Sequence, residues 1–151
     1  MKGLGTALIT PFTEDGKVDF QSLSNLIEHQ VAGGTDYLVI LGTTSEVPTL
    51  THQEQNAIID YVVKQVAGRM PLVLGIGGNS TAAVVERIGE LKEQLIAHFT
   101  AILSVTPYYN RPQQEGLYQH FCAVAEASPL PVILYNVPKR TGVNLLPETT
   151  R

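Results

Sequence analysis

The chain has 151 residues, of which 44% are hydrophobic and 16% are charged, with a net charge of −4 and a single cysteine, Cys122. This composition is typical of a soluble globular domain and excludes a disordered chain, a basic nucleic-acid-binding surface and an intrachain disulfide. The first residues carry no signal-peptide pattern, and no apolar run approaches the roughly 20 residues that a membrane-spanning helix requires. We therefore expect a cytoplasmic protein.

Short apolar strands and amphipathic helices alternate along the sequence. Asp19 is placed to cap the first helix, and Gly33 with Gly34 closes it. Thr51 and Glu54 form a capping-box pattern at the start of the second helix. Strands are predicted over residues 4–10, 37–41, 72–74, 101–105 and 132–134, and helices over 20–32, 51–66, 80–96 and 115–127, with the first turn of a fifth helix at 147–148.

The strands are almost continuously apolar, which indicates a parallel α/β sheet covered by helices. Each strand–helix unit takes roughly 30 residues, the usual length of such a unit. Two architectures have this pattern, an open doubly wound sheet and a (β/α)8 barrel. Because a barrel normally needs about 250 residues, length alone favours the open sheet, such as a flavodoxin-like domain.

Three of the strands end in polar clusters, where parallel α/β folds usually place their chemistry. Thr43 and Thr44 follow the second strand, and their hydroxyls could bind a small carboxylate or simply form a turn. Tyr109 follows the fourth strand and Tyr135 ends the fifth, and phenols in such positions can transfer protons. Arg140 suits bidentate binding of a carboxylate, with a solvated loop arginine as an equal alternative.

Other chemistries lack support in the sequence. Residues 75–78 (GIGG) do not meet the glycine spacing of a dinucleotide-binding fingerprint. The four histidines fall on predicted helices without metal-ligand spacing, so we expect no metal site. Cys122 lies among apolar neighbours on a predicted helix and is expected to be a small buried residue rather than a reactive thiol.

Four stretches of the chain resemble the dihydrodipicolinate synthase family, within the pyruvate-dependent aldolases that include N-acetylneuraminate lyase. They are residues 3–12 (GLGTALITPF), 42–46 (GTTSE), 105–110 (VTPYYN) and 135–142 (YNVPKRTG), in the family's order and spacing, and residues 114–118 fit as well. The resemblance implies a (β/α)8 TIM barrel and overrides the argument from length. It also implies a homo-oligomeric lyase (dimer or tetramer) that condenses pyruvate with L-aspartate 4-semialdehyde through a Schiff base, in lysine (diaminopimelate) biosynthesis.

The resemblance gives each strand-end residue a role. Thr44 would hold the pyruvate carboxylate, and Thr43, Tyr109 and Tyr135 would form a proton relay in which Tyr135 donates and accepts the proton. The family's counterpart of Tyr109 reaches into the neighbouring subunit's site. Arg140 would guide the carboxylate of the semialdehyde, and its Lys-Arg-Thr-Gly segment favours the synthase over the neuraminate lyase. No cofactor is implied, because a lysine amine serves as the electron sink.

Two departures from the family's pattern concern single positions. Ser45 stands where the family usually has glycine, and a positive φ there would cost a serine about 1 kcal/mol or more. Gln55 and Ala83 stand where the lysine-inhibited members have a histidine and a glutamate. In those members the glutamate carboxylate would bind the ammonium group of lysine. Ala83 has no carboxylate, so we expect weak or absent feedback inhibition by lysine.

The third departure is the extent of the match. The chain resembles only the first five strands and four to five helices, so we expect residues 1–151 to be the N-terminal portion of a single barrel domain, truncated before strand six. The family's Schiff-base lysine lies on strand six. Lys64, on a predicted helix, and Lys139, on a predicted loop, are not in that context, so the isolated chain is expected to be inactive. Two alternatives stay open: a related pyruvate aldolase that acts on a sugar acid, and an inactive half-barrel that serves as a binding module.

Overall fold

A computed structural model describes residues 1–91 and 96–150. They form two compact units, the first with residues 1–75 and 96–100 and the second with residues 76–91 and 101–150. The strands belong to one parallel sheet in the order β1-β2-β3-β4-β5. Each strand is thus the neighbour of the next one along the chain, as in a (β/α)8 barrel. A flavodoxin-like sheet has a different order, in which the first strand lies between the second and the third.

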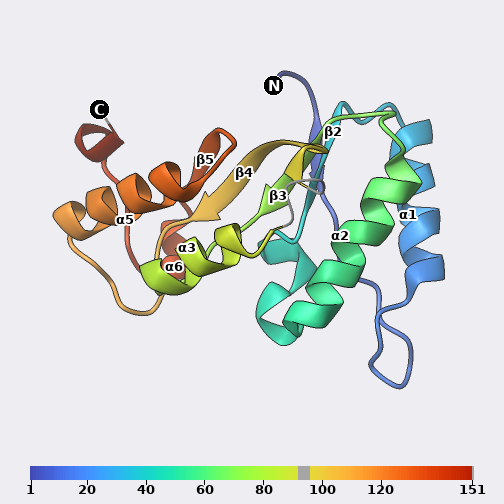
Figure 1. The fold of residues 1–151 in the computed structure, drawn as a ribbon, viewed down its shortest axis with the longest axis horizontal. Helices are drawn as coiled ribbons and strands as arrows, with labels where there is room; N and C mark the ends of the chain where they lie inside the picture. Colours follow the sequence, from blue (N-terminus) through green and yellow to red (C-terminus); the bar gives the residue numbers. More distant parts are fainter. Residues whose placement is uncertain (92–95, 151) are drawn as a thin grey trace. The chain divides into compact units, whose positions relative to one another are not determined.

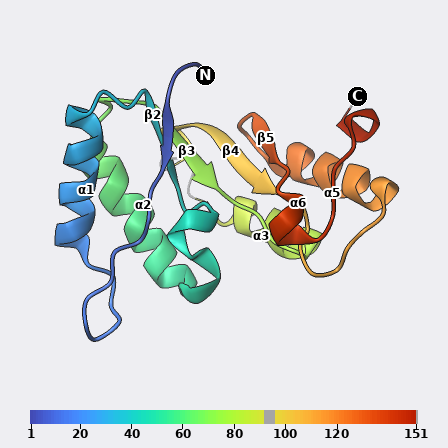
Figure 2. The same ribbon diagram turned by 180° about the vertical axis from the view of Figure 1, so that it is seen from behind.

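Strands and helices alternate in the predicted sequence (Figures 1 and 2). The strands are β1 (Gly5–Ala7), β2 (Tyr37–Ile40), β3 (Leu72–Gly75), β4 (Phe99–Val105) and β5 (Val132–Tyr135). The helices are α1 (Phe20–Ala32), α2 (His52–Val66), α3 (Thr81–Gly89), α5 (Gln114–Ala127) and α6 (Pro138–Thr141). Within the described residues, none of these helices has the length and apolar character to cross a membrane.

In the first unit, α1 and α2 pack side by side (Figures 1 and 2). Asp19 accepts a hydrogen bond from the first turn of α1, and the predicted capping box of Thr51 and Glu54 begins α2. Phe20 of α1 lies against Tyr61 of α2, with ring centroids 4.9 Å apart. The apolar faces of both helices and strands β2 and β3 are buried together, through Leu23, Ile27, Leu38, Ile40, Ile59, Val62, Val66, Val73 and Leu74.

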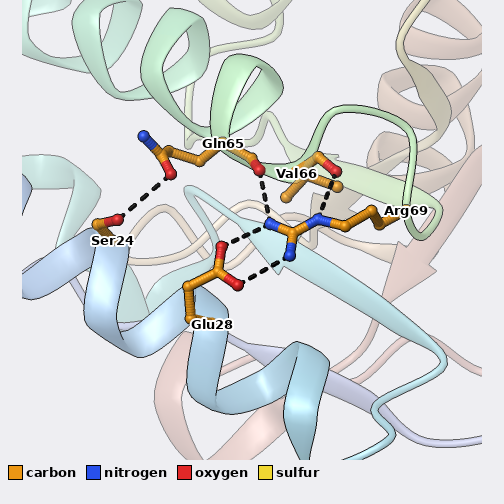
Figure 3. A network of polar contacts seen from close by, with 5 residues as sticks. All are labelled: Ser24, Glu28, Gln65, Val66 and Arg69. Atoms are coloured by element: carbon orange, nitrogen blue, oxygen red, sulfur yellow. Dashed lines mark hydrogen bonds and ion pairs between the residues drawn. The ribbon is translucent and has the colours of Figure 1, made fainter.

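Arg69, three residues after α2, ties the end of α2 to α1 (Figure 3). Its guanidinium donates to both carboxylate oxygens of Glu28, at 2.8 and 2.5 Å, and to the main-chain carbonyls of Gln65 and Val66. Ser24 Oγ donates to Gln65 Oε1 at 3.3 Å in the same network. The Arg69 guanidinium holds the pKa of the Glu28 carboxyl below its ordinary value. Because both side chains are exposed, we expect this pair to stabilise the fold only modestly.

In the second unit, α5 packs on α3 and carries the local core. His120 of α5 is buried, its Nδ1 lies 2.8 Å from Thr81 Oγ1 at the start of α3, and burial lowers the pKa of its imidazole. Leu117 and Phe121 of the same helix pack with Leu145. His120, which the sequence places on a helix, thus packs between α5 and α3.

Several assignments differ from the prediction, most of them by one or two residues. β1 is shorter than predicted because, beyond Ala7, the Leu8 carbonyl and the Thr10 hydroxyl bind Ser45. The helix predicted to reach residue 96 ends at Gly89, since glycine is a weak helix former; residues 92–95 of that prediction lie outside the described residues. Residue 98, predicted on a helix, lies in a turn.

The structure also corrects two single-residue expectations. Lys139 and Arg140 lie in the helical turn α6 rather than in a loop, because Pro138 suits the first helical position and Gly142, with φ of +73°, ends the turn. Cys122 is only half-buried, and it interacts with the hydroxyl of Tyr118, whose pKa this contact raises. The apolar neighbours of Cys122 in sequence do not surround it in space, because a helix turns them to different faces.

Candidate functional site

Thr43 and Thr44 lie in a tight turn directly after β2. The chain leaves the strand at Leu41, whose φ is +53°, and Thr43–Ser45 form one turn of 3-10 helix that ends at Glu46, with φ of +56°. Both threonine side chains are exposed. The turn therefore presents two adjacent hydroxyls beyond the carboxyl end of a strand.

Gly75, at the end of β3, makes room for this bend. A Cβ built on Gly75 would lie 2.1 Å from the carbonyl oxygen of Leu41 and 2.7 Å from the backbone nitrogen of Gly42. Only glycine allows the two backbones to approach this closely. The sequence shows Gly75 only as part of an incomplete dinucleotide fingerprint, so its steric role is not visible there.

Ser45 is not strained. The family usually has glycine here, and a serine would be strained only if φ were positive, which it is not. It lies within the 3-10 turn and is not among the residues with positive φ. Its side chain is 2% exposed, and Ser45 Oγ donates to the Leu8 carbonyl at 2.7 Å. The Ser45 carbonyl in turn accepts a hydrogen bond from Thr10 Oγ1 at 2.9 Å. The serine thus adds a bond between the turn and the residues that follow β1.

Tyr109 is held outward by a strained turn after β4. Its φ is +71°, and the N–H of Asn110 donates to the Tyr108 carbonyl at 2.8 Å. A three-residue turn with this φ is the rarer, strained form. The Tyr109 side chain is 87% exposed. Strained backbone of this kind clusters at binding and catalytic sites.

Two hydrogen bonds hold the loop that carries Tyr109. Asn110 Nδ2 donates to the Asn79 carbonyl at 2.6 Å, which ties the loop to the segment before α3. Arg111, with φ of +51°, donates from Nε to the Gly142 carbonyl at 3.2 Å, which ties it to the end of α6. The sequence offered no sign of these anchors beyond their place in a polar strand end.

Tyr135 and Arg140 follow one another at the carboxyl end of β5. Tyr135 pairs in register with Val105 of β4 and is partly buried. Arg140 lies on α6 with an exposed side chain, and the turn is fixed by Thr141, which is 3% exposed and donates from Oγ1 to the Val143 carbonyl at 3.0 Å. The guanidinium is thus displayed on a rigid turn rather than on a loose loop.

The structure therefore places every predicted site residue beyond or at the carboxyl end of a strand. Thr43 and Thr44 share one turn in the first unit. In the second unit, the loop of Tyr109 is bonded to the turn of Arg140 through Arg111 and Gly142, and Tyr135 lies on the strand paired with β4. Hydroxyls, phenols and a guanidinium can bind carboxylates and move protons.

Gln55 and Ala83, which stand where the lysine-inhibited members have a histidine and a glutamate, form hydrogen bonds within the fold. Gln55 is 8% exposed, and its Nε2 donates to the Leu50 carbonyl at 3.1 Å, which uses the amide within the fold. Ala83 lies in the first turn of α3, where its N–H donates to Ser80 Oγ. Neither side chain offers a carboxylate to an ammonium ion.

Comparison with known proteins gives one consistent answer. The family model described as the dihydrodipicolinate synthetase family matches residues 1–151. A 4-hydroxy-tetrahydrodipicolinate synthase of Parabacteroides distasonis is 58% identical over 150 residues, which are 99% of this chain and 50% of that protein. The corresponding protein of Bacillus subtilis is 50% identical over 147 residues, 97% of this chain and 50% of that protein. The chain thus spans about half the length of the curated relatives that it matches.

The solved structures agree with the sequences. The structure of the 4-hydroxy-tetrahydrodipicolinate synthase of Methylacidiphilum fumariolicum is similar with a TM-score of 0.92 and 39% identity, over 99% of this chain and 49% of that one. A crystal structure of a dihydrodipicolinate synthase gives a TM-score of 0.90 and 45% identity, over 99% and 50% of the two chains. The predicted barrel class is confirmed for the strands present. The chain belongs to the dihydrodipicolinate synthetase family.

Proposed function

We propose that residues 1–151 supply the pyruvate-positioning and proton-transfer part of a lyase that condenses pyruvate with L-aspartate 4-semialdehyde through a Schiff base. In this proposal the chain is the N-terminal portion of one barrel domain. The observation that carries it is the placement of Thr43, Thr44, Tyr109, Tyr135 and Arg140 at strand carboxyl ends, in a chain that belongs to this family. Barrel enzymes build their active sites from these ends.

Each proposed role matches the chemistry of the side chain. Thr44 binds the pyruvate carboxylate with its exposed hydroxyl. Tyr135, Thr43 and Tyr109 pass protons during imine formation and carbon–carbon bond formation, with Tyr135 as the group next to the reacting atoms. Imine formation releases water and needs both proton donation and removal, which a chain of hydroxyls supplies without a cofactor.

The amine that forms the imine lies outside these residues in the proposed enzyme. Lys64 is on the exposed face of α2 and Lys139 is exposed on α6, and neither ends a strand. We place the lysine in the half of the barrel that the matched relatives have and these 151 residues do not include. Experiments therefore use the protein at its natural length and a fusion of residues 1–151 to the second half of the Parabacteroides relative, called here the fusion protein.

Tyr109 supports an oligomeric enzyme. Tyr109 is 87% exposed on a strained turn, so most of its surface is free to contact another molecule. We propose that it enters the site of a neighbouring subunit, as the resemblance implies. Sedimentation of the fusion protein and of its Tyr109→Ala variant tests whether this contact holds subunits together.

Arg140 provides the sharpest test of the semialdehyde as substrate. Losing a charge-assisted hydrogen bond to a carboxylate costs about 1.5–3 kcal/mol, which corresponds to a roughly 10- to 150-fold rise in KM. Arg140→Gln is therefore expected to raise KM for the semialdehyde on this scale while KM for pyruvate stays nearly constant. Lys139→Gln removes the neighbouring exposed charge from the same turn and is the matched control, expected to change neither constant. Equal effects of the two variants, or turnover of a sugar acid in place of the semialdehyde, would overturn the assignment.

A further inference from the structure

The turn that carries Thr43 and Thr44 is fastened to the segment after β1 by two buried hydrogen bonds that meet at one residue. Ser45 Oγ donates to the Leu8 carbonyl at 2.7 Å, and Thr10 Oγ1 donates to the Ser45 carbonyl at 2.9 Å. All three residues are at most 5% exposed. We propose that this Ser45 clamp, made of Leu8, Thr10 and Ser45, is the positioning device that sets the two threonine hydroxyls for pyruvate.

The geometry of the turn shows why it needs a clamp. It is a single turn of 3-10 helix, closed by backbone bonds of 3.1 Å (Ser45 N to Gly42 O) and 3.2 Å (Glu46 N to Thr43 O), which are long for such bonds. The residues on either side, Leu41 and Glu46, are non-glycine residues with positive φ. Short 3-10 turns are weakly held by their own hydrogen bonds. The clamp adds two buried hydroxyl hydrogen bonds that come from the segment after a different strand.

Both bonds meet at the last residue of the turn. Ser45 directly follows Thr44, so a rotation of residue 45 is transmitted to the backbone of residue 44. The Oγ bond fixes the side chain of Ser45, and the Thr10 bond fixes its carbonyl, so the residue that follows Thr44 is held at two points. A glycine at this position keeps only the carbonyl bond and adds backbone freedom. The serine is therefore a positioning residue that acts through Thr43 and Thr44.

The inference rests on the proposed function for the substrate, and the expected effects follow from it. Ser45→Ala removes one buried hydrogen bond. Because that bond holds the turn in the geometry that binds pyruvate, its loss should lower kcat/KM for pyruvate about 3- to 10-fold. KM for the semialdehyde, which Arg140 binds, is expected to change less than 2-fold. Thr10→Val removes the second bond at nearly constant volume and should likewise lower kcat/KM for pyruvate while KM for the semialdehyde stays nearly constant. Thr10→Ser keeps the hydroxyl and should keep kcat/KM for pyruvate near the wild-type value.

The experiment measures steady-state kinetics for both substrates and Tm, on the natural-length protein and the fusion protein. Ser128→Ala is the matched control, because Ser128 Oγ donates to the Leu130 carbonyl at the same 2.7 Å on a different element; it should lower Tm without a pyruvate-specific loss. A pyruvate-specific loss in Ser45→Ala and Thr10→Val, but not in Ser128→Ala or Thr10→Ser, supports the clamp. Unchanged kcat/KM for pyruvate in Ser45→Ala, or an equal loss for both substrates, overturns it. An inactive parent protein instead refutes the proposed function.

Discussion

Replacing Gly75 by alanine should displace the turn that carries the two threonines. The added Cβ would lie 2.1 Å from the Leu41 carbonyl oxygen, and real Cβ contacts are essentially never below 3.0 Å, so the two backbones must separate by about 0.9 Å. Both partners are main-chain atoms at neighbouring strand ends and cannot rotate away. Overpacking of this kind lowers the free energy of unfolding by about 1–3 kcal/mol. Because the contact is between rigid main-chain atoms, we expect a loss near the upper end of this range.

Urea unfolding followed by circular dichroism measures this cost. With a slope near 2 kcal/mol/M, a loss of about 2–3 kcal/mol lowers the midpoint by about 1–1.5 M. Gly89→Ala is the control, because a Cβ there meets nothing within 4 Å and the residue ends a helix, so the midpoint should stay or rise. A midpoint for Gly75→Ala within the error of the wild type would refute the steric argument, since the clash would then be relieved at no cost.

Three other results follow from the structure. Tyr109→Phe should slow turnover with little change in Tm, because Tyr109 is 87% exposed; an unchanged rate in the fusion protein counts against the relay. Arg69→Gln should lower Tm at neutral pH. Since Arg69 depresses the folded-state pKa of Glu28, the pair stabilises the fold above the ordinary pKa of that carboxyl and loses its effect as the pH falls through the lowered value. The difference in Tm should therefore narrow in acid, and the bonds to the Gln65 and Val66 carbonyls account for what is left; a constant difference contradicts this. Sub-millimolar lysine should inhibit weakly or not at all, because Ala83 offers no carboxylate to the ammonium group of lysine, and clear inhibition would refute this.

The pattern of apolar and polar residues predicted most of the helices and strands. Helix α1 and the capping box of α2 agree with the prediction because both depend on local side-chain to backbone bonds that a sequence displays directly. The end of β1 was mispredicted because it is decided by Ser45, 37 residues away from Leu8. The sheet order could not come from length or periodicity, since open sheets and barrels share the same strand pattern.

The candidate site shows the same division. The residue types at the strand ends were visible, and so was the family resemblance. The bonds that hold them were not: Arg111 reaches Gly142 across 31 positions, and Gly75 matters only because the Leu41 carbonyl lies against it. The family usually has glycine at position 45, which raised the prospect of backbone strain at Ser45. In the structure Ser45 instead forms two buried hydrogen bonds. Contacts between distant segments depend on the packed fold, which single positions do not reveal.

Trapping of the pyruvate imine locates the amine that forms the Schiff base. The fusion protein is incubated with pyruvate and borohydride, and the reduced adduct is located by mass spectrometry of peptides. We expect one adduct per chain, on a lysine outside residues 1–151, and none when residues 1–151 are treated alone. No adduct on the fusion protein, or an adduct on Lys64 or Lys139, would contradict the claim that this chain positions pyruvate and moves protons while another segment supplies the amine.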